Sequence, residues 1–161
     1  MGEKKHMKNY EKTGILDKKD LSLPSEEQLK KGVAIIECIQ EIPCNPCVES
    51  CPVHAISMEN INALPKIDYD KCIGCGQCVG ICPGLAIFVV KLKDDKALIT
   101  LPYEFLPIPK IGDMVDALNR EGEKIDNALV KKIIKKGKTS IVTIEVKKEY
   151  IMDIRNIRVK I

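Results

Sequence analysis

The apolar positions of the chain fall mostly into short runs, and two of these runs directly follow cysteine-rich loops. The runs cover residues 55–58 and 86–92, and each is followed by a polar turn and a second short run, at residues 64–68 and 97–101. Short apolar segments joined by turns of Asn, Asp or Glu are typical of β-hairpins. The pattern therefore predicts two small hairpins, one after each loop.

The part of the chain before the first cysteine predicts a polar arm, a helix and a strand. Residues 1–20 carry ten charged side chains and show little periodicity, which is typical of a mobile arm. Ser25 and Gln28 have the spacing of a capping box at the start of a helix that ends at Gly32. The apolar residues 33–36 then predict a buried strand that leads into the cysteines.

The sequence after residue 101 is rich in predicted strands. Prolines at 102, 107 and 109 predict an extended linker, and residues 142–146 alternate apolar with polar side chains as a half-buried strand does. Further candidates lie at residues 112–118, 128–135 and 154–161. For the second of these, a short helix fits nearly as well. Several short strands with glycine turns predict a small β-barrel.

The composition is that of a globular protein and excludes several classes. The chain has 161 residues, of which 45% are hydrophobic and 30% charged, with a net charge of +3 and no Trp. Neither a disordered chain nor an aromatic-rich nucleic-acid-binding surface fits these values. No apolar run approaches the length of about 18 residues typical of a membrane span, and no secretory signal follows the polar N-terminus. We therefore expect a cytoplasmic location, no transmembrane segment and no nucleic-acid partner.

Charge and cysteine content divide the chain into three parts. Residues 32–90 carry two basic and six acidic side chains, whereas residues 91–161 carry 16 basic and 11 acidic ones. All eight cysteines lie in the acidic middle part. In a reducing compartment disulfides are rare, so this many thiols indicates metal binding. In the basic part, five lysines between positions 131 and 138 fit a solvated element end; an acidic-partner surface and a nucleic-acid site are the alternatives.

The cysteines belong to an internal repeat with an offset of 31 residues. Residues 44–56 align with residues 75–87 and share three cysteines and one Val, Pro, Ala and Ile each. Upstream of these segments, one cysteine stands three residues before Cys75, whereas Cys38 stands six residues before Cys44. The chain therefore contains two copies of one small unit, and the first copy has an insertion.

The second copy has the spacing of an iron–sulfur loop, Cys72-x2-Cys75-x2-Cys78-x3-Cys82-Pro83. Three thiolates at three-residue spacing can surround one [4Fe–4S] cubane, and the fourth cysteine of such a run binds the other cluster. The glycines between the cysteines let backbone amides approach the sulfides. Crossing the fourth cysteines gives two ligand sets that use all eight thiols. Cluster one is expected to take Cys38, Cys44, Cys47 and Cys82, and cluster two is expected to take Cys51, Cys72, Cys75 and Cys78.

The sequence leaves two alternatives to this assignment open. Cys38 is the least secure ligand because of its longer spacer, and without it cluster one would be a [3Fe–4S] form or have a labile iron. Two zinc sites of four thiolates are the other interpretation, although zinc prefers CxxC pairs with longer spacers. No phosphate loop or catalytic triad accompanies the cysteines, and His54 is expected to be a packing or surface residue. We therefore expect one-electron transfer without a catalytic residue.

The cysteine runs of residues 37–101 resemble those of bacterial-type ferredoxins with two [4Fe–4S] clusters. A longer resemblance, over about residues 14–161, rests on Gly32-x3-Ile-Glu-Cys38, on Ile42-Pro-Cys-Asn-Pro-Cys-x3-Cys-Pro52, on residues 101–113 and on Arg120-Glu-Gly122. There the chain is similar to the iron–sulfur subunits of multi-subunit FAD-dependent dehydrogenases of anaerobes. This resemblance implies a hetero-oligomer with FAD-containing subunits that oxidise an amino acid such as proline or hydroxyproline, or glycerol 3-phosphate. It also implies an external electron acceptor.

Together these features predict an α+β fold, with a ferredoxin-like duplicated two-cluster module followed by a small β-barrel-like domain. The expected parts are a mobile arm at 1–20, a helix–strand lead-in at 21–36, the dicluster domain at 37–101 and a β-rich domain at 102–161. The expected function is an electron-transfer subunit with two [4Fe–4S] clusters that relays electrons between flavin sites and an acceptor. The alternatives are a free soluble ferredoxin and a zinc-stabilised nucleic-acid-binding or scaffold protein. Abundant Ile and Lys suggest a thermophile.

Overall fold

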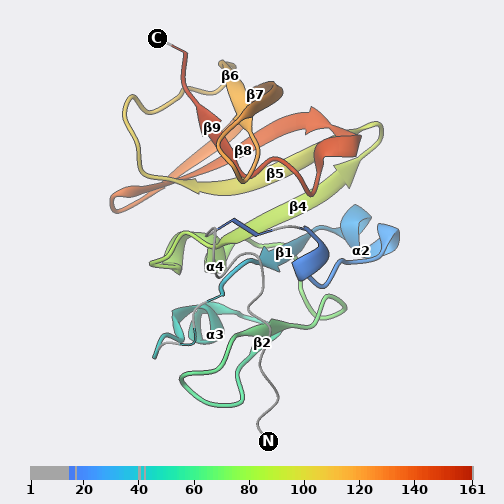
Figure 1. The fold of residues 1–161 in the computed structure, drawn as a ribbon, viewed down its shortest axis with the longest axis vertical. Helices are drawn as coiled ribbons and strands as arrows, with labels where there is room; N and C mark the ends of the chain where they lie inside the picture. The colour runs from blue at the N-terminus through green and yellow to red at the C-terminus, as the bar shows by residue number, and fades with distance from the viewer. Residues whose placement is uncertain (1–14, 17, 40, 42, 161) are drawn as a thin grey trace, which may run out of the picture.

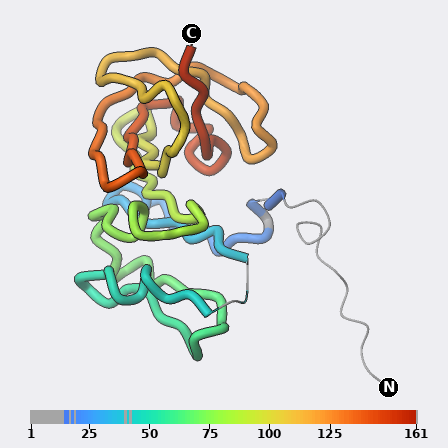
Figure 2. Tube along the Cα trace, turned by 90° about the vertical axis from the view of Figure 1, so that its left-hand side faces the viewer, coloured from blue at the N-terminus to red at the C-terminus, as the bar shows by residue number. Residues whose placement is uncertain are grey.

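The protein consists of a cysteine-rich part below and a strand-rich part above in the view of Figure 1. The computed structural model describes residues 15–16, 18–39, 41 and 43–160. We call residues 33–86 the cysteine half and residues 87–158 the strand half. In the turned view of Figure 2 the same division holds, with the cysteine half below and the C-terminal strands above.

The mobile arm expected over residues 1–20 lies mostly outside the described residues, which begin at residue 15. Within it, Lys18–Asp20 form a short 3-10 helix, η1, and the mobility of the arm stays a prediction. The Lys18 side chain forms an ion pair with Asp153, with 3.4 Å between Nζ and Oδ1. This contact joins the N-terminal region to the strand half.

Helix α2, Glu26–Lys31, begins with the predicted capping box. The Gln28 backbone N–H donates to Ser25 Oγ over 3.3 Å, and the Ser25 N–H donates to Gln28 Oε1 over 2.8 Å. The helix ends at Gly32, whose φ of 92° is a conformation that residues with a Cβ rarely adopt. Both the start and the end of this helix are as the sequence predicted.

The cysteine half, together with β4, contains two copies of a strand–loop–helix–strand unit. The first comprises β1 (Val33–Ile36), α3 (Pro46–Ser50) and β2 (Ile56–Ser57), and the second comprises β3 (Lys66–Ile67), α4 (Gln77–Ile81) and β4 (Ile87–Lys93). Strand β2 pairs with β3, and β1 pairs with β4, both antiparallel. The first predicted hairpin is therefore confirmed, and the pairing of β1 with β4 adds a contact between the two copies.

The strand half continues the sheet that begins in the cysteine half. Strand β4 forms the second predicted hairpin with β5, and the strand order is β1-β4-β5-β8-β7-β6-β9, with every neighbouring pair antiparallel. The bounds of the added strands are Lys96–Tyr103 for β5, Met114–Leu118 for β6, Lys124–Lys136 for β7, Thr139–Lys147 for β8 and Asn156–Arg158 for β9. A second 3-10 helix, η2 (Lys148–Tyr150), lies between the last two strands in sequence.

The strands of this sheet test several predictions about the sequence after residue 101. The strands predicted within residues 112–118, 142–146 and 154–161 are present, and residues 128–135 belong to a strand, not to a helix. The expected boundary at residue 101 falls inside β5, and Pro102 is part of this strand, not of a linker. There β5 pairs with β8 alone, an edge position at which the missing N–H of proline is tolerated. The barrel-like closure stays a prediction, since no pairing joins β1 with β9 among the described residues.

The two halves share one hydrophobic core. Val79 in α4 is fully buried against the sheet. A Cβ placed on Gly80 would lie 2.7 Å from Ile141 Cδ1 in β8, a distance that ordinary carbon contacts do not reach. The helix that carries one of the cysteines therefore packs directly on a strand of the strand half, and glycine at this position allows the close approach.

Candidate metal centre

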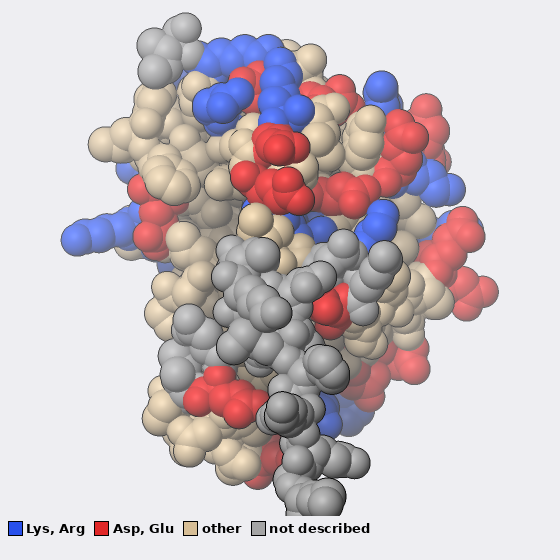
Figure 3. All heavy atoms as spheres, in the orientation of Figure 1, with Lys and Arg blue, Asp and Glu red and all other residues tan. Residues whose placement is uncertain are grey.

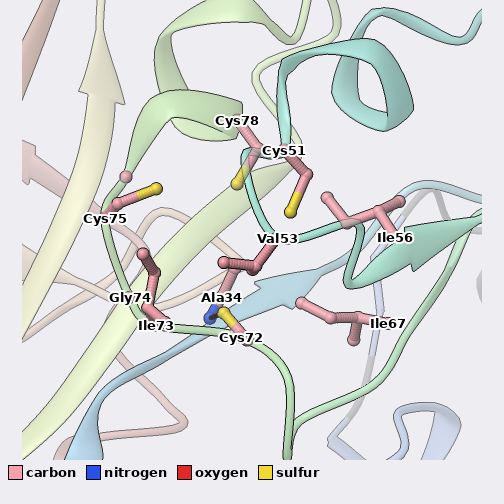
Figure 4. Close-up of a pocket in the computed structure, with 11 residues that line it drawn as sticks. Ala34, Cys51, Val53, Ile56, Ile67, Cys72, Ile73, Gly74, Cys75 and Cys78 are labelled. Carbon is pink, nitrogen blue, oxygen red and sulfur yellow. Dashed lines mark hydrogen bonds between the residues drawn. The ribbon is translucent and has the colours of Figure 1, made fainter.

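The eight cysteines line two separate cavities, four around each. The first cavity is bordered by Cys51, Cys72, Cys75 and Cys78, and Figure 4 shows these four side chains around one space. Its walls are otherwise apolar and include Val53, Ile56 and Ile67. Cys51, Cys72 and Cys78 are buried, whereas Cys75 is exposed. The cavity therefore comes close to the surface on the side of Cys75.

The second cavity is bordered by Cys38, Cys44, Cys47 and Cys82. Its other walls are again apolar and include Ile36, Pro65 and Ile87. The two cavities are of similar size, with about 310 and 370 Å³ of empty space. The similarity agrees with the origin of both sites in one duplicated unit. In this cavity Cys38 lies beside the other three cysteines, despite the insertion that follows Cys38 in the sequence.

The crossing of the fourth cysteines follows from the ends of two helices. Cys51 caps the end of α3 and Cys82 caps the end of α4, with φ and ψ of −75° and 113° in the first and −70° and 115° in the second. Helices α3 and α4 pack against each other. After each helix the backbone becomes extended and leads away from the cysteine loop of its own copy. Each fourth cysteine therefore reaches the cavity formed by the other copy. The sets that the structure brings together are those that the spacing predicted to share a cluster.

Backbone amides donate hydrogen bonds to three of the sulfur atoms. The Ala55 N–H donates to Cys51 Sγ over 3.3 Å, and the equivalent Ala86 N–H donates to Cys82 Sγ over 3.4 Å. A third bond, from the Ala34 N–H in β1 to Cys72 Sγ, spans 3.3 Å. Hydrogen bonds of this kind stabilise negative charge on sulfur, and around a metal cluster they tune its reduction potential.

Burial disfavours the thiolate form of two of the cysteines. Burial raises the pKa of the Cys78 thiol to about 12, and the nearby Cys72 and Cys75 contribute to this rise. Burial also raises the pKa of Cys47, to which Cys82 and Cys44 contribute. The cysteines that act most on each thiol belong to its own cavity. A bound cation would displace these protons, because thiolates, not thiols, are metal ligands.

Two glycines shape the loop before α4. Gly74 has a φ of +67°, and a Cβ there would lie 2.9 Å from the carbonyl oxygen of Gly32, so the loop packs directly on the backbone before β1. Gly76 caps the start of α4 in the left-handed conformation, with a φ of 79°. The sequence had assigned these glycines to close backbone approach, and the structure adds the backbone conformation as a second reason.

The thiols border cavities and do not converge on one point. Among residues 15–160 as described, no group of three or more His, Cys, Asp or Glu side chains is arranged to hold a single metal ion. Four thiols around an apolar space, with amide donors to their sulfur atoms, suit a cluster that has several metal corners. His54 is exposed and lines neither cavity, which agrees with its prediction as a packing or surface residue.

One buried group of charges was missed at the level of the sequence. Glu37, directly before Cys38, accepts a hydrogen bond from Arg120 Nε at Oε1 over 2.5 Å and one from Arg155 Nε at Oε2 over 2.7 Å. These partners lie 83 and 118 residues away in sequence. The chain has only three arginines among its 26 basic residues, and this scarcity was the signal that could have drawn attention to them.

The comparisons with known proteins support iron–sulfur binding by this chain. The family model of the 4Fe-4S binding domain matches residues 65–88, which contain the second cysteine run. The chain thus carries a ferredoxin-type [4Fe–4S] segment, and the prediction of iron–sulfur binding is confirmed. The match covers one run, so the count of two clusters stays a prediction.

Several known proteins are similar to part of the chain. The polyferredoxin-like subunit of the aliphatic sulfonate oxidoreductase of Pyrococcus furiosus is 35% identical over 57 residues, or 35% of this chain and 33% of that protein. One subunit of the ion-translocating oxidoreductase complex of Methanosarcina acetivorans is 42% identical over 57 residues, or 35% and 20% of the two chains. The ferredoxin-type protein NapF of Haemophilus influenzae is 37% identical over 78 residues, or 46% and 43%.

The similarity is therefore confined to a segment. The matched part spans only a third or less of the length of the first two of these relatives. No solved structure matches the chain. Within the described ranges, none of the helices has the length and apolar character needed to cross a bilayer.

Proposed function

We propose that the chain binds two [4Fe–4S] clusters, one in each four-cysteine cavity, and relays electrons between them. The observation that carries this proposal is the sorting of all eight cysteines into two cavities of similar size. The apolar walls, the amide donors to sulfur and the family match to the second run support it. A cluster bound there supplies reversible one-electron transfer.

The residues of the chain hold and tune these clusters. The thiolates bind iron, and the hydrogen bonds at Cys51, Cys72 and Cys82 offset part of the negative charge. Helices α3 and α4 pack side by side and lead from one cavity to the other, which favours transfer between the clusters. Cys75 and the neighbouring Ile73, which is 55% exposed, make the first cavity the side that a redox partner can approach.

We further propose that the chain is the electron-transfer subunit of an FAD-dependent dehydrogenase complex, with an amino acid such as proline or hydroxyproline, or glycerol 3-phosphate, as substrate. The motifs around the cysteine runs support this, and two relatives are named as subunits of oxidoreductases. Four large apolar side chains between β5 and β7 are exposed, as is common where a partner binds. They are Phe105, Leu106, Ile111 and Met114.

Charge also differs between the two halves. On the face shown in Figure 3, Lys and Arg side chains gather at the top, over the C-terminal strands. Lysines 131, 132, 135, 136 and 138 are all exposed around the β7–β8 turn. An acidic surface on a partner protein would complement these five lysines.

Metal and sulfide analysis of protein purified without oxygen tests the cluster proposal. Two cubanes of four iron each predict about eight iron and eight sulfide per chain. Two zinc ions per chain without acid-labile sulfide would overturn the proposal. Purification of the tagged chain from its native cells tests the second proposal. FAD-containing chains in constant ratio are expected, whereas a monomer that is fully active as a carrier would favour a free ferredoxin.

A further inference from the structure

A third cavity, separate from the cysteine sites, lies where the two halves meet. It contains about 760 Å³ of empty space and is open to the surface. Its polar lining comes from the end of β1, the β6–β7 turn and the start of β9. The lining residues are Glu37, Asn119, Arg120, Gly122, Arg155 and Asn156. Its apolar side is formed by Leu85, Ala86 and Phe88, which follow the last cysteine, and by Ile15 and Leu16 near the start of the described chain.

The cavity has an excess of positive charge. Two guanidinium groups share the single carboxylate of Glu37, which leaves a net charge of +1 among the lining residues. Both guanidinium groups are largely withdrawn from solvent, with 13% of the Arg120 side chain and 4% of the Arg155 side chain exposed. Charge is screened weakly in such a place, so an anion that enters is attracted strongly.

Arg155 is held rigidly by several partners. Its Nη1 donates to the carbonyl oxygens of Ile151 and Ile154 over 2.9 and 2.7 Å, and its Nη2 contacts the sulfur of Met152 at 3.5 Å. The ring of Phe88 lies 5.3 Å from its guanidinium carbon, as in a cation–π contact. Arg155 therefore contributes fixed positive charge to the cavity without the mobility of a surface arginine.

Arg120 and the two asparagines supply donors for which no hydrogen bond to another described residue is found. Arg120 donates through Nε to Glu37, but its Nη2 is buried and has no hydrogen-bond partner among the described residues. Asn119 accepts through Oδ1 from the N–H groups of Glu121 and Glu123, and Asn156 accepts through Oδ1 from that of Ile157. In both side chains the NH2 group is distinct from these acceptors and can donate. Donors of this kind beside a positive cavity are complementary to an oxyanion.

We propose that this cavity binds a phosphate group, either as free phosphate or as part of a larger molecule such as a nucleotide. Arg120, Asn119 and Asn156 provide the donors, and Arg155 provides fixed charge. A second part of this inference rests on the two-cluster proposal: the site also influences the reduction potential of the cluster held by Cys38 and Cys82. The Glu37 N–H donates to the Ala86 carbonyl over 2.8 Å, and the Ala86 N–H donates to Cys82 Sγ.

An anion in this cavity opposes the addition of an electron to the adjacent cluster. Phosphate binding therefore lowers the reduction potential of that cluster, and reduction weakens phosphate binding by the same factor. The other cluster, whose ligands do not contact these residues through the hydrogen bonds described, is affected less. The cavity would thus report the presence of a phosphate compound to one of the two redox centres.

Equilibrium dialysis of the full chain with inorganic phosphate, adenosine 5′-monophosphate and adenosine tests the site. Binding of phosphate or of the nucleotide is expected, with no binding of adenosine, and the comparison of the first two separates free phosphate from a nucleotide. Asn119→Asp keeps the acceptor for the turn but adds negative charge, and Arg120→Gln removes a positive charge. Each is expected to weaken binding about tenfold or more. Arg158→Gln, outside the cavity, is the matched control and should leave binding unchanged.

Several results would overturn the proposal. Failure of the wild-type chain to bind any phosphate compound at millimolar concentration would do so, as would equal binding of adenosine or unchanged binding by Asn119→Asp. Iron is measured in the same samples, so missing clusters and a missing phosphate site are separate results. In the iron-loaded chain, saturating phosphate should lower the potential of one cluster in a redox titration. An unchanged potential would refute the coupling between the site and the cluster.

Discussion

The two halves of the molecule are stabilised in different ways. In the cysteine half no described strand is longer than the four residues of β1, and α3 and α4 have five residues each. In the strand half, β7 has 13 residues and β8 has nine. Of the twelve largest fully buried side chains described, only Val33, Ile35 and Val79 belong to the cysteine half. Helices and strands this short are not stable by themselves.

If the two proposed clusters are bound, we expect the fold of the cysteine half to depend on them, whereas that of the strand half depends on hydrophobic burial. In a half with so little buried core, metal binding by the thiols would supply free energy of folding. The strand half has a continuous sheet and a core of Ile, Leu and Val, which needs no ligand. Four experiments test this contrast.

The largest effect is expected from removal of iron. Chelation under anaerobic conditions should abolish amide protection between residues 43 and 83, because the thiols then lose their common partner. Protection in β7 and β8 should persist. Hydrogen exchange read by mass spectrometry measures both halves in one sample. Equal loss of protection in the two halves would contradict the contrast.

Replacement of one cysteine should remove one cluster and leave the other. Cys78→Ser takes a buried ligand from the first cavity, so iron content should fall from about eight to about four per chain. Cys47→Ser is the matched change in the second cavity and should cause the same loss with a different spectroscopic signal. Iron analysis and electron paramagnetic resonance check both variants. Loss of neither cluster in Cys78→Ser would contradict the crossed ligand sets.

The carboxylate of Glu37, which joins the halves, should contribute less to the free energy of unfolding than a cluster does, but more than a packing contact does. Glu37→Ala leaves Arg155 buried without its counter-charge, which should lower the free energy of unfolding by about 3–5 kcal/mol. Glu49→Ala, at an exposed position in α3 without a described ion pair, serves as the control and should change the free energy of unfolding little. Denaturant unfolding of the iron-loaded protein measures both. A Glu37 variant as stable as the Glu49 variant would show that the buried pair does not hold the halves together.

The packing of α4 on β8 should give the smallest effect. Gly80→Val places atoms where Ile141 already lies, and overpacking of this kind costs about 1–3 kcal/mol. A Cβ at Gly84 would meet nothing within 4 Å, so Gly84→Val is the control and should be nearly neutral. The midpoint of denaturant unfolding compares them. Equal midpoints would mean that α4 can move away from the sheet at no cost.

Much of the local structure could be predicted, because neighbouring residues determine it. The capping box at Ser25 depends on residues three apart, and the two hairpins depend on short runs and turns. The grouping of the cysteines was also predictable, since a repeat of 31 residues limits how two loops can share eight thiols. In these cases the spacing along the chain carries the geometry.

Other features depend on partners far away in the sequence. Residues 128–135 have a pattern that suits a helix or a strand, and pairing of β7 with β8 and β6 decided for the strand. The position of Pro102 within β5 became acceptable only because one side of that strand is unpaired there. No local pattern could have shown either result.

By itself the sequence determined the repeat, the cysteine spacing and the elements formed by near neighbours, because thiol spacing and turn residues act over a few bonds. Only the tertiary structure joined β1 to β4, so that both halves share one sheet, and brought Glu37 to Arg120 and Arg155. The physical reason is that burial withdraws these charges and strand edges from water. Each must then find a partner, wherever in the chain that partner lies.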